Sequence, residues 1–252
     1  MSRQFATVRE FREFASERIG EEHMPFGCEW LFALTAGWDK VEFEEIYSDY
    51  VWSTQLNLVQ GDDATRLKGD PLEELARYFL ERGGVVTRIR ELSSPARWQV
   101  DGQGSLNITA TKETWGKTAQ DLGFQLYLET KNHSDPARGD EFSEHFRRMM
   151  NHDCRTGVFV STSGFRVGRG LGIAESIREN YLTGIVHLLL SFPLLRQVRV
   201  DRMPPLAILR DVLCFAANNS YADDKLVQQL YSAEYCQTCV EQEFEELFPN
   251  DA

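Results

Sequence analysis

The chain lacks the long apolar segment that a membrane span requires. Its most apolar stretch, residues 184–191, is only as long as a strand and contains His187. The first ten residues hold no apolar signal core and include charged side chains. We therefore expect a cytoplasmic protein with no membrane partner.

Cysteine is scarce and scattered. The five cysteines are odd in number and widely spaced, which is typical of free or buried thiols in a reducing compartment. Cys236 and Cys239 have the spacing of half a zinc site. No second ligand pair accompanies them, so the sequence does not predict a zinc centre.

Motifs for nucleotide binding and for nucleophilic catalysis are also missing. Gly168-Arg-Gly170-Leu-Gly172 lies between a predicted strand and a predicted helix, but it matches neither the dinucleotide-binding nor the P-loop pattern. No nucleophile elbow occurs. We interpret the glycine-rich segment as a flexible loop, with Arg166 and Arg169 as candidate contacts to phosphate.

Positive charge is in deficit, with 27 Lys+Arg against 39 Asp+Glu and a net charge of -12. Such a balance argues against a nucleic-acid partner, because neutralising phosphate needs a basic surface. The deficit lies at the two ends, however. Residues 1–65 and 211–252 each carry a net charge of -8, whereas residues 66–210 carry +4. The centre thus remains suited to a phosphate substrate, and the acidic ends suit protein contacts.

What the sequence does contain is a succession of helical and strand patterns from residue 67 onward. Asp70-Pro71 resembles a helix N-cap followed by proline, and the helix is predicted to stop at Gly83-Gly84. The segments predicted after it are a strand (85–90), an extended segment bent or bulged at Gly102-Gln-Gly104 (98–110), a polar loop (111–123), a strand (124–131), a helix (139–153), a strand (157–161), a helix (174–181) and a strand (185–190). This order predicts an α/β fold, with a mixed sheet covered by helices.

Three segments follow from these patterns. Residues 1–65 form an acidic, aromatic-rich N-terminal extension with an amphipathic helix over 4–19. Residues 66–192 form the α/β core, and residues 193–252 form an acidic helical C-terminal extension.

The strand over 124–131 carries the most informative residues. Side chains alternate across a strand, so Glu129 and Lys131 share one face. Asp101, on the preceding extended segment, is the candidate for a second carboxylate there. Two carboxylates and a strand carbonyl form a hard oxygen site suited to Mg²⁺, and an adjacent ammonium can orient water or offset phosphate charge. This set is typical of metal-assisted phosphodiester hydrolysis.

These residues resemble the PD-(D/E)XK nuclease superfamily, which includes the restriction-endonuclease-like proteins. Residues 68–75 resemble the opening helix of that family, Trp98-Gln-Val-Asp101 its metal-binding aspartate, and Glu129-Thr130-Lys131 its E-x-K strand. Residues 156–165 resemble a later strand and turn. The resemblance covers about residues 68–190 and implies a mixed central sheet flanked by helices.

The resemblance also implies roles for individual residues. Asp101 and Glu129 would bind Mg²⁺ or Mn²⁺ with the Thr130 carbonyl, Lys131 would position the attacking water, and Glu73 would be a second-metal or structural carboxylate. The separation of 28 residues between Asp101 and Glu129 is long for a hairpin. Two rivals for the first carboxylate lie closer in the sequence, Glu113 and Asp121, and we favour Asp101 over both.

The expected activity is therefore a metal-dependent endonuclease acting on DNA, with RNA also open, in restriction or phage defence. His145 and Arg148, three residues apart on the next helix, are further candidates for phosphate contacts. The main alternative is a catalytically silent nuclease fold that docks a protein partner, or a second copy of itself, through its acidic flanks. A third reading is an interaction module in which the E-x-K triplet is fortuitous.

Overall fold

A computed structural model of the chain describes residues 28–55, 62–92, 101–115, 123–166, 173–218 and 224–249. The helix predicted over 4–19 lies outside these ranges, as do Asp121 and Arg169. None of the helices within them has both the length and the apolar character needed to cross a membrane.

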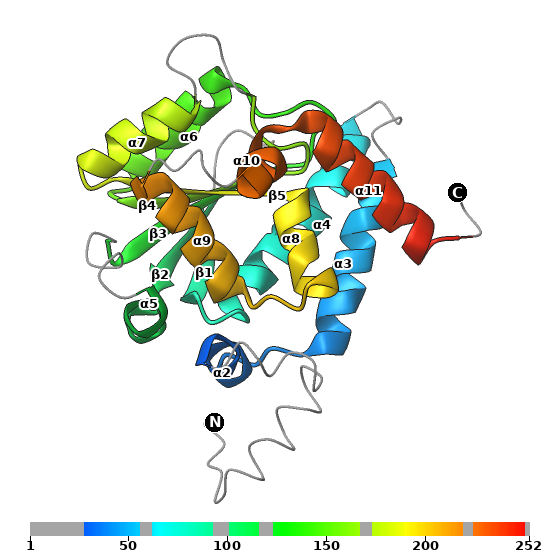
Figure 1. Ribbon diagram of the computed structural model, residues 1–252, viewed down its shortest axis with the longest axis horizontal. Helices are drawn as coiled ribbons and strands as arrows, with labels where there is room; N and C mark the ends of the chain where they lie inside the picture. The colour runs from blue at the N-terminus through cyan, green and yellow to red at the C-terminus, as the bar shows by residue number, and fades with distance from the viewer. Residues whose placement is uncertain are drawn as a thin grey trace, which may run out of the picture.

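A mixed sheet forms the centre of the molecule (Figure 1). Its strands are β1 (Val86–Leu92), β2 (Asp101–Leu106), β3 (Gln125–Lys131), β4 (Thr156–Ser161) and β5 (Val186–Ser191). They lie side by side in sequence order. The first three are antiparallel, and β4 and β5 continue parallel to β3. The predicted α/β class with a mixed sheet flanked by helices is confirmed.

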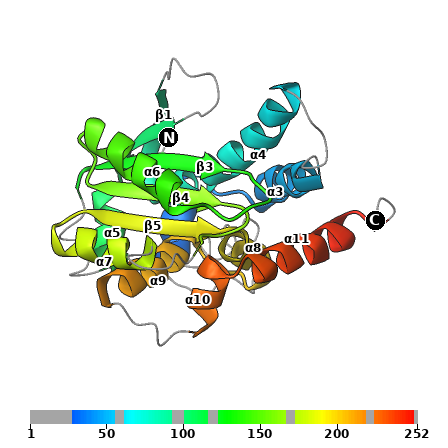
Figure 2. The same ribbon diagram turned by 90° about the horizontal axis from the view of Figure 1, so that it is seen from above.

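Helices cover both faces of this sheet. The helices of the described ranges are α2 (Cys28–Thr35), α3 (Lys40–Thr54), α4 (Asp62–Glu81), α5 (Ile108–Trp115), α6 (Gly139–Asn151), α7 (Ile173–Leu182), α8 (Phe192–Val200), α9 (Pro205–Asn218), α10 (Asp224–Tyr231) and α11 (Ala233–Leu247). Because α6 and α7 connect successive parallel strands and such crossovers are right-handed, both lie on one face. Figure 1 shows them together there, while α4 and α9 contact the other face. Helices α3, α8 and α11 gather beyond the C-terminal ends of β3 to β5 (Figure 2).

The burial pattern of the strands follows from this cover. All residues of β4 and β5 are buried, as expected for parallel strands with helices on both faces. On β3, successive side chains enter different clusters. Leu126 and Leu128 join the main core, whereas Tyr127 packs with Met149 and Cys154 beneath α6. The side chains on the Tyr127 face of β3 therefore point toward α6.

The predicted start of the helix at Asp70-Pro71 is wrong. Helix α4 begins at Asp62, and Pro71 lies inside it. A proline within a helix removes one main-chain hydrogen bond. Leu72, Leu75 and Phe79 are each 0% exposed, and burial of this apolar stripe offsets that cost.

The segment after β2 also differs from the prediction. Residues 108–115, expected to be partly extended and partly loop, form α5. Asn107 caps this helix, since its Oδ1 accepts a hydrogen bond from the Ala110 amide at 3.2 Å. Trp115 anchors the other end, where its buried indole donates to the Leu206 carbonyl at 2.9 Å.

Gly102 and Gly104, where a bend or bulge is predicted, both lie within β2. A Cβ added to Gly102 would come within 2.7 Å of Ile89 Cγ2 on the neighbouring strand. The glycines thus make room for Ile89. The pairing with β1 shifts between Val86–Leu106 and Ile89–Gly104, so an irregularity does occur beside Gly104, with the extra residue on β1.

One hydrophobic core includes residues from all three predicted segments. The acidic flanks also help to hold the fold together through ion pairs. Glu243 of α11 is 0% exposed and accepts hydrogen bonds from Arg196 and Arg199 of α8. Arg199 also contacts Glu44 of α3 at 3.1 Å. Part of the negative charge of both flanks therefore holds α3, α8 and α11 together.

Candidate active site

The E-x-K residues of β3 pair with α6. Glu129 is 1% exposed, and its Oε2 lies 3.2 Å from His145 Nδ1. Lys131 Nζ donates to Glu141 Oε1 at 2.8 Å. Because a carboxylate accepts hydrogen bonds, we assign the proton between Glu129 and the imidazole to Nδ1. Both predicted groups are therefore held by side chains of the following helix.

The two pairs match in spacing. Two residues along a strand advance by about 6.6 Å, and four residues along a helix advance by about 6 Å. Glu129 and Lys131 are two apart, whereas His145 and Glu141 are four apart in the opposite chain direction. One side chain of α6 therefore lies beside each of the two strand residues, Glu141 beside Lys131 and His145 beside Glu129. We call Glu141 and His145 the α6 pair.

Glu141 was missed by the sequence reasoning, although its position at the start of a predicted helix was a signal. Its Oε2 accepts a hydrogen bond from the Arg138 amide at 2.9 Å, as in a helix cap. Burial acts to raise the pKa of Glu141, but hydrogen bonds from Lys131 and from the Arg138 amide lower it overall. The Lys131 ammonium therefore faces a carboxylate that stays ionised near neutral pH.

Two polar atoms at this place have no hydrogen-bond partner among the described residues. They are Glu129 Oε1 and His145 Nε2. A buried carboxylate oxygen without a donor is costly unless another group satisfies it. Glu129 therefore has one oxygen held by the protein and one buried oxygen without a donor among the described residues.

A second buried histidine lies behind the first. The His187 and His145 rings are 5.7 Å apart, and the Asn180 amide nitrogen lies 3.1 Å from His187 Nε2. Burial, and then the neighbouring His145, lower the pKa of His187 well below its usual value. His187 is therefore neutral at physiological pH.

Asp101 is placed beside this site by its main chain. Strands β2 and β3 pair with Gly102 opposite Leu128. Asp101 precedes Gly102 and Glu129 follows Leu128, so the main chains of Asp101 and Glu129 lie next to this pair. The Asp101 side chain lies outside the described part of the structure. Its rival Glu113 is exposed on α5, the helix between β2 and β3.

The remaining predicted groups are distributed around the sheet. Thr130 pairs with Val160 in the β3–β4 ladder and is partly exposed. Glu73 forms an ion pair with Arg77 along α4. Because α4 and α6 cover opposite faces of the sheet, the structure does not bring Glu73 to the α6 pair (Figure 1).

The candidate phosphate contacts differ in accessibility. His145 is 0% exposed, which does not fit the predicted contact with phosphate. Arg148 is bound by Glu144 at 2.9 Å. Hydrogen bonds from Arg147 and Arg148 lower the pKa of Glu144 to about 2. Arg166, in contrast, is exposed in the loop that follows β4.

Arg166 is joined to the loop that follows β3. Its amide donates to the Ala137 carbonyl at 2.8 Å, and Ser163 Oγ donates to the His133 carbonyl at 2.7 Å. These contacts bring exposed Arg138 and His133 to the same loop cluster, at the C-terminal ends of β3 and β4. Arg138 was not predicted as a site residue. Its position depends on the pairing of two loops, which the sequence pattern does not reveal.

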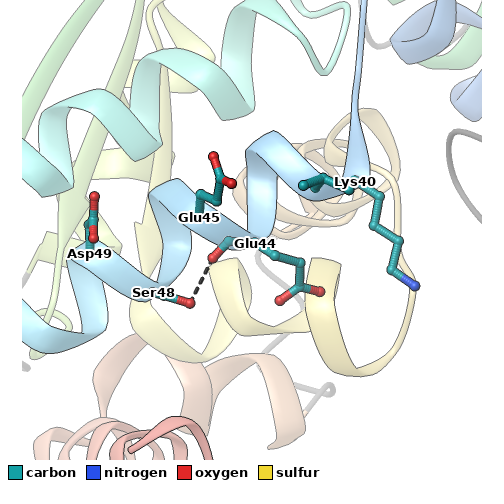
Figure 3. A pocket seen from close by; sticks show the side chains of 6 residues that line it. Lys40, Glu44, Glu45, Ser48 and Asp49 are labelled. Carbon is teal, nitrogen blue, oxygen red and sulfur yellow. Dashed lines mark hydrogen bonds between the residues drawn. The ribbon is translucent and has the colours of Figure 1, made fainter.

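A separate pocket of about 630 Å³ lies along α3 (Figure 3). Its lining residues are Lys40, Val41, Glu44, Glu45, Ser48 and Asp49. None of them belongs to β3, β4 or α6. Three carboxylates against one ammonium would repel a phosphate backbone, so this pocket is not part of the nuclease-like site.

No cluster of three or more histidine, cysteine or acidic side chains suited to a metal occurs within the described ranges. Cys236 and Cys239 are free, buried thiols on α11. The glycine-rich segment 168–172 lies outside the description. Comparison with models of known families, with curated proteins and with solved structures found no match for the chain.

Proposed function

We propose that the protein is a metal-dependent nuclease of the PD-(D/E)XK type, with a restriction-endonuclease-like core, that hydrolyses phosphodiester bonds of DNA. The observation that carries this proposal is the geometry of β3. Glu129 offers a buried carboxylate oxygen without a partner, Lys131 lies two residues further on the same face, and the register brings the main chain of Asp101 alongside.

A Mg²⁺ or Mn²⁺ ion fits the donor chemistry of this place. Glu129 would hold it through Oε1, with Asp101 as the second carboxylate and the Thr130 carbonyl as a further oxygen. When bound, such an ion supplies Lewis acidity and offsets negative charge on a phosphate. The unpartnered Oε1 supports this assignment because a cation would satisfy it.

Lys131 would act on the attacking water. Its ammonium is fixed by Glu141 at 2.8 Å and has two further hydrogens to donate. One of them can hold a water beside the scissile phosphate, and the positive charge favours the anionic substrate. Glu141 holds Lys131 in place through this contact, so we assign Lys131 to orienting the water.

The substrate would approach the C-terminal ends of β3 and β4. The loop cluster there carries the exposed residues Arg166 and His133, which can contact the phosphate backbone, and Arg138, whose guanidinium is paired with Asp140 at 3.0 Å. A role in restriction or phage defence rests on the family resemblance alone.

Removing divalent metal is expected to abolish cleavage. The measurement is cleavage of supercoiled plasmid and of labelled RNA by the full chain in Mg²⁺, in Mn²⁺ and in EDTA. Activity in either metal that is lost in EDTA and restored by adding metal back supports the proposal. Cleavage that continues at the same rate in EDTA would contradict it. The two substrates decide between DNA and RNA.

One observation favours the alternative of a silent nuclease fold. Both charged groups of the E-x-K strand are paired with α6, and Glu129 and His145 are almost completely buried. Pairs of this kind would also form if their one role were to hold α6 against the sheet. A folded wild-type protein that neither cleaves nucleic acid nor binds Mn²⁺ would favour this alternative.

A further inference from the structure

We propose that His145 is a positioning residue that fixes the metal-binding carboxylate of Glu129. This inference rests on the proposed function and assigns His145 a role other than phosphate contact. The His145 Nδ1 hydrogen bond holds Oε2 at 3.2 Å. It leaves Oε1, the atom without a partner among the described residues, as the metal ligand.

The His145 ring is itself held in one orientation. It stacks on Phe159 with ring centroids 4.9 Å apart and lies 5.4 Å from the Tyr127 ring. Phe142 and His187 are the next rings on the same side. A ring enclosed in this way loses little further freedom when it donates a hydrogen bond, so the Glu129 carboxylate is held before a metal arrives.

Gly157 of β4 provides the space for this ring. A Cβ at Gly157 would lie 2.7 Å from His145 Nε2 and 2.6 Å from Met149 Sδ. Any larger residue would therefore push the imidazole from its place. The glycine explains how a bulky ring and a carboxylate can share the narrow layer between β3, β4 and α6.

Partners that orient a metal ligand commonly affect metal binding by about 10- to 100-fold when they are removed. The ring of His145 allows a matched comparison. His145→Phe retains an aromatic ring of similar size but has no donor, whereas His145→Asn carries an amide nitrogen close to the Nδ1 position. If His145 acts by positioning Glu129, the variant that keeps a hydrogen-bond donor should retain metal binding. If His145 acts by packing alone, the variant that keeps an aromatic ring should retain it.

The test is the dissociation constant of Mn²⁺, measured by titration calorimetry on the full chain. We expect the dissociation constant to be roughly 10- to 100-fold higher for His145→Phe and within about threefold of the wild-type value for His145→Asn. Gly157→Ala, which changes no polar group, is expected to weaken Mn²⁺ binding by about 10-fold. Plasmid cleavage at saturating substrate should fall in the same order.

Wild-type affinity in both His145→Phe and Gly157→Ala would overturn the positioning role of His145 and leave the proposed function standing. A weaker affinity in His145→Asn than in His145→Phe would do so too, because packing would then outweigh the donor. Wild-type protein that binds no Mn²⁺ would contradict the proposed function, and this inference with it. Thermal unfolding identifies a variant that has lost its fold, in which case the other two variants decide.

Discussion

Glu129→Gln is expected to lower metal-dependent cleavage by more than about 100-fold. The loss of a direct metal ligand should exceed the roughly 10- to 100-fold cost of losing an outer partner. Glutamine has nearly the same shape, and its amide oxygen can still accept from His145 Nδ1. The variant therefore removes the charge that attracts the cation while it keeps the packing of α6. The measurement is single-turnover cleavage of plasmid DNA in Mg²⁺.

Glu179→Gln is the matched control for this variant, because Glu179 is exposed on α7 and lies on a different helix from the α6 pair. It should cleave at the wild-type rate. Both variants should unfold at nearly the wild-type temperature if the effect at Glu129 is chemical. Cleavage by Glu129→Gln at the wild-type rate would remove Glu129 from the active site.

Glu243→Ala is expected to lower the free energy of unfolding by about 3 kcal/mol. The Glu243 side chain is 0% exposed and accepts from two arginines of α8. Its removal leaves partly buried guanidinium groups without this partner and opens a gap between α8 and α11. The cost is at the lower end for a broken buried pair because Arg199 keeps Glu44 and Glu246. Denaturant unfolding followed by circular dichroism measures the change.

Glu245→Ala serves as the comparison for this prediction. Glu245 is two residues along the same helix and is exposed, so its loss should change the free energy of unfolding by no more than about 0.5 kcal/mol. Equal effects of the two variants would mean that the ion pairs of Glu243 do not hold the C-terminal helix. A large effect at Glu243 alone would show that negative charge of the C-terminal flank is used inside the fold.

The parts of the fold that local patterns determine were predictable. The alternation in β3 placed Glu129 and Lys131 on one face, and the strands and crossover helices from β3 to β5 were expected within a few residues of their observed bounds. These features depend on side-chain periodicity over short stretches. The start of α4 was not predicted, because Asp70-Pro71 has the pattern of a helix start although the helix already begins at Asp62.

The contacts around the site depend on packing between elements and were not predictable in the same way. The local pattern of α6 places His145 on the same helix face as Phe142 and Met149, but it does not indicate that Glu141 would meet Lys131 or that His145 would meet Glu129. These contacts follow from the rotation of α6 over β3. The position of Asp101 similarly depends on strand register, which brings residues 28 apart in the sequence next to one another.

The acidic composition acquires a different meaning in the folded chain. The net charge of -12 argues against a nucleic-acid partner if it is spread over the surface. Glu243 and Glu44, however, are paired with arginines between α3, α8 and α11. The exposed residues Arg138 and Arg166 lie on adjoining loops at the C-terminal ends of β3 and β4, where Arg138 is paired with Asp140 at 3.0 Å.

The most direct test of the proposed site is the position of Mn²⁺ in crystals of the wild-type protein, located by its anomalous scattering. The account predicts a Mn²⁺ ion bonded to Glu129 Oε1 and to the Asp101 carboxylate, with Lys131 beside it. Crystals grown in saturating Mn²⁺ that show no ion at Glu129, or ions bound only elsewhere, would contradict the assignment of this strand as a metal-dependent nuclease site.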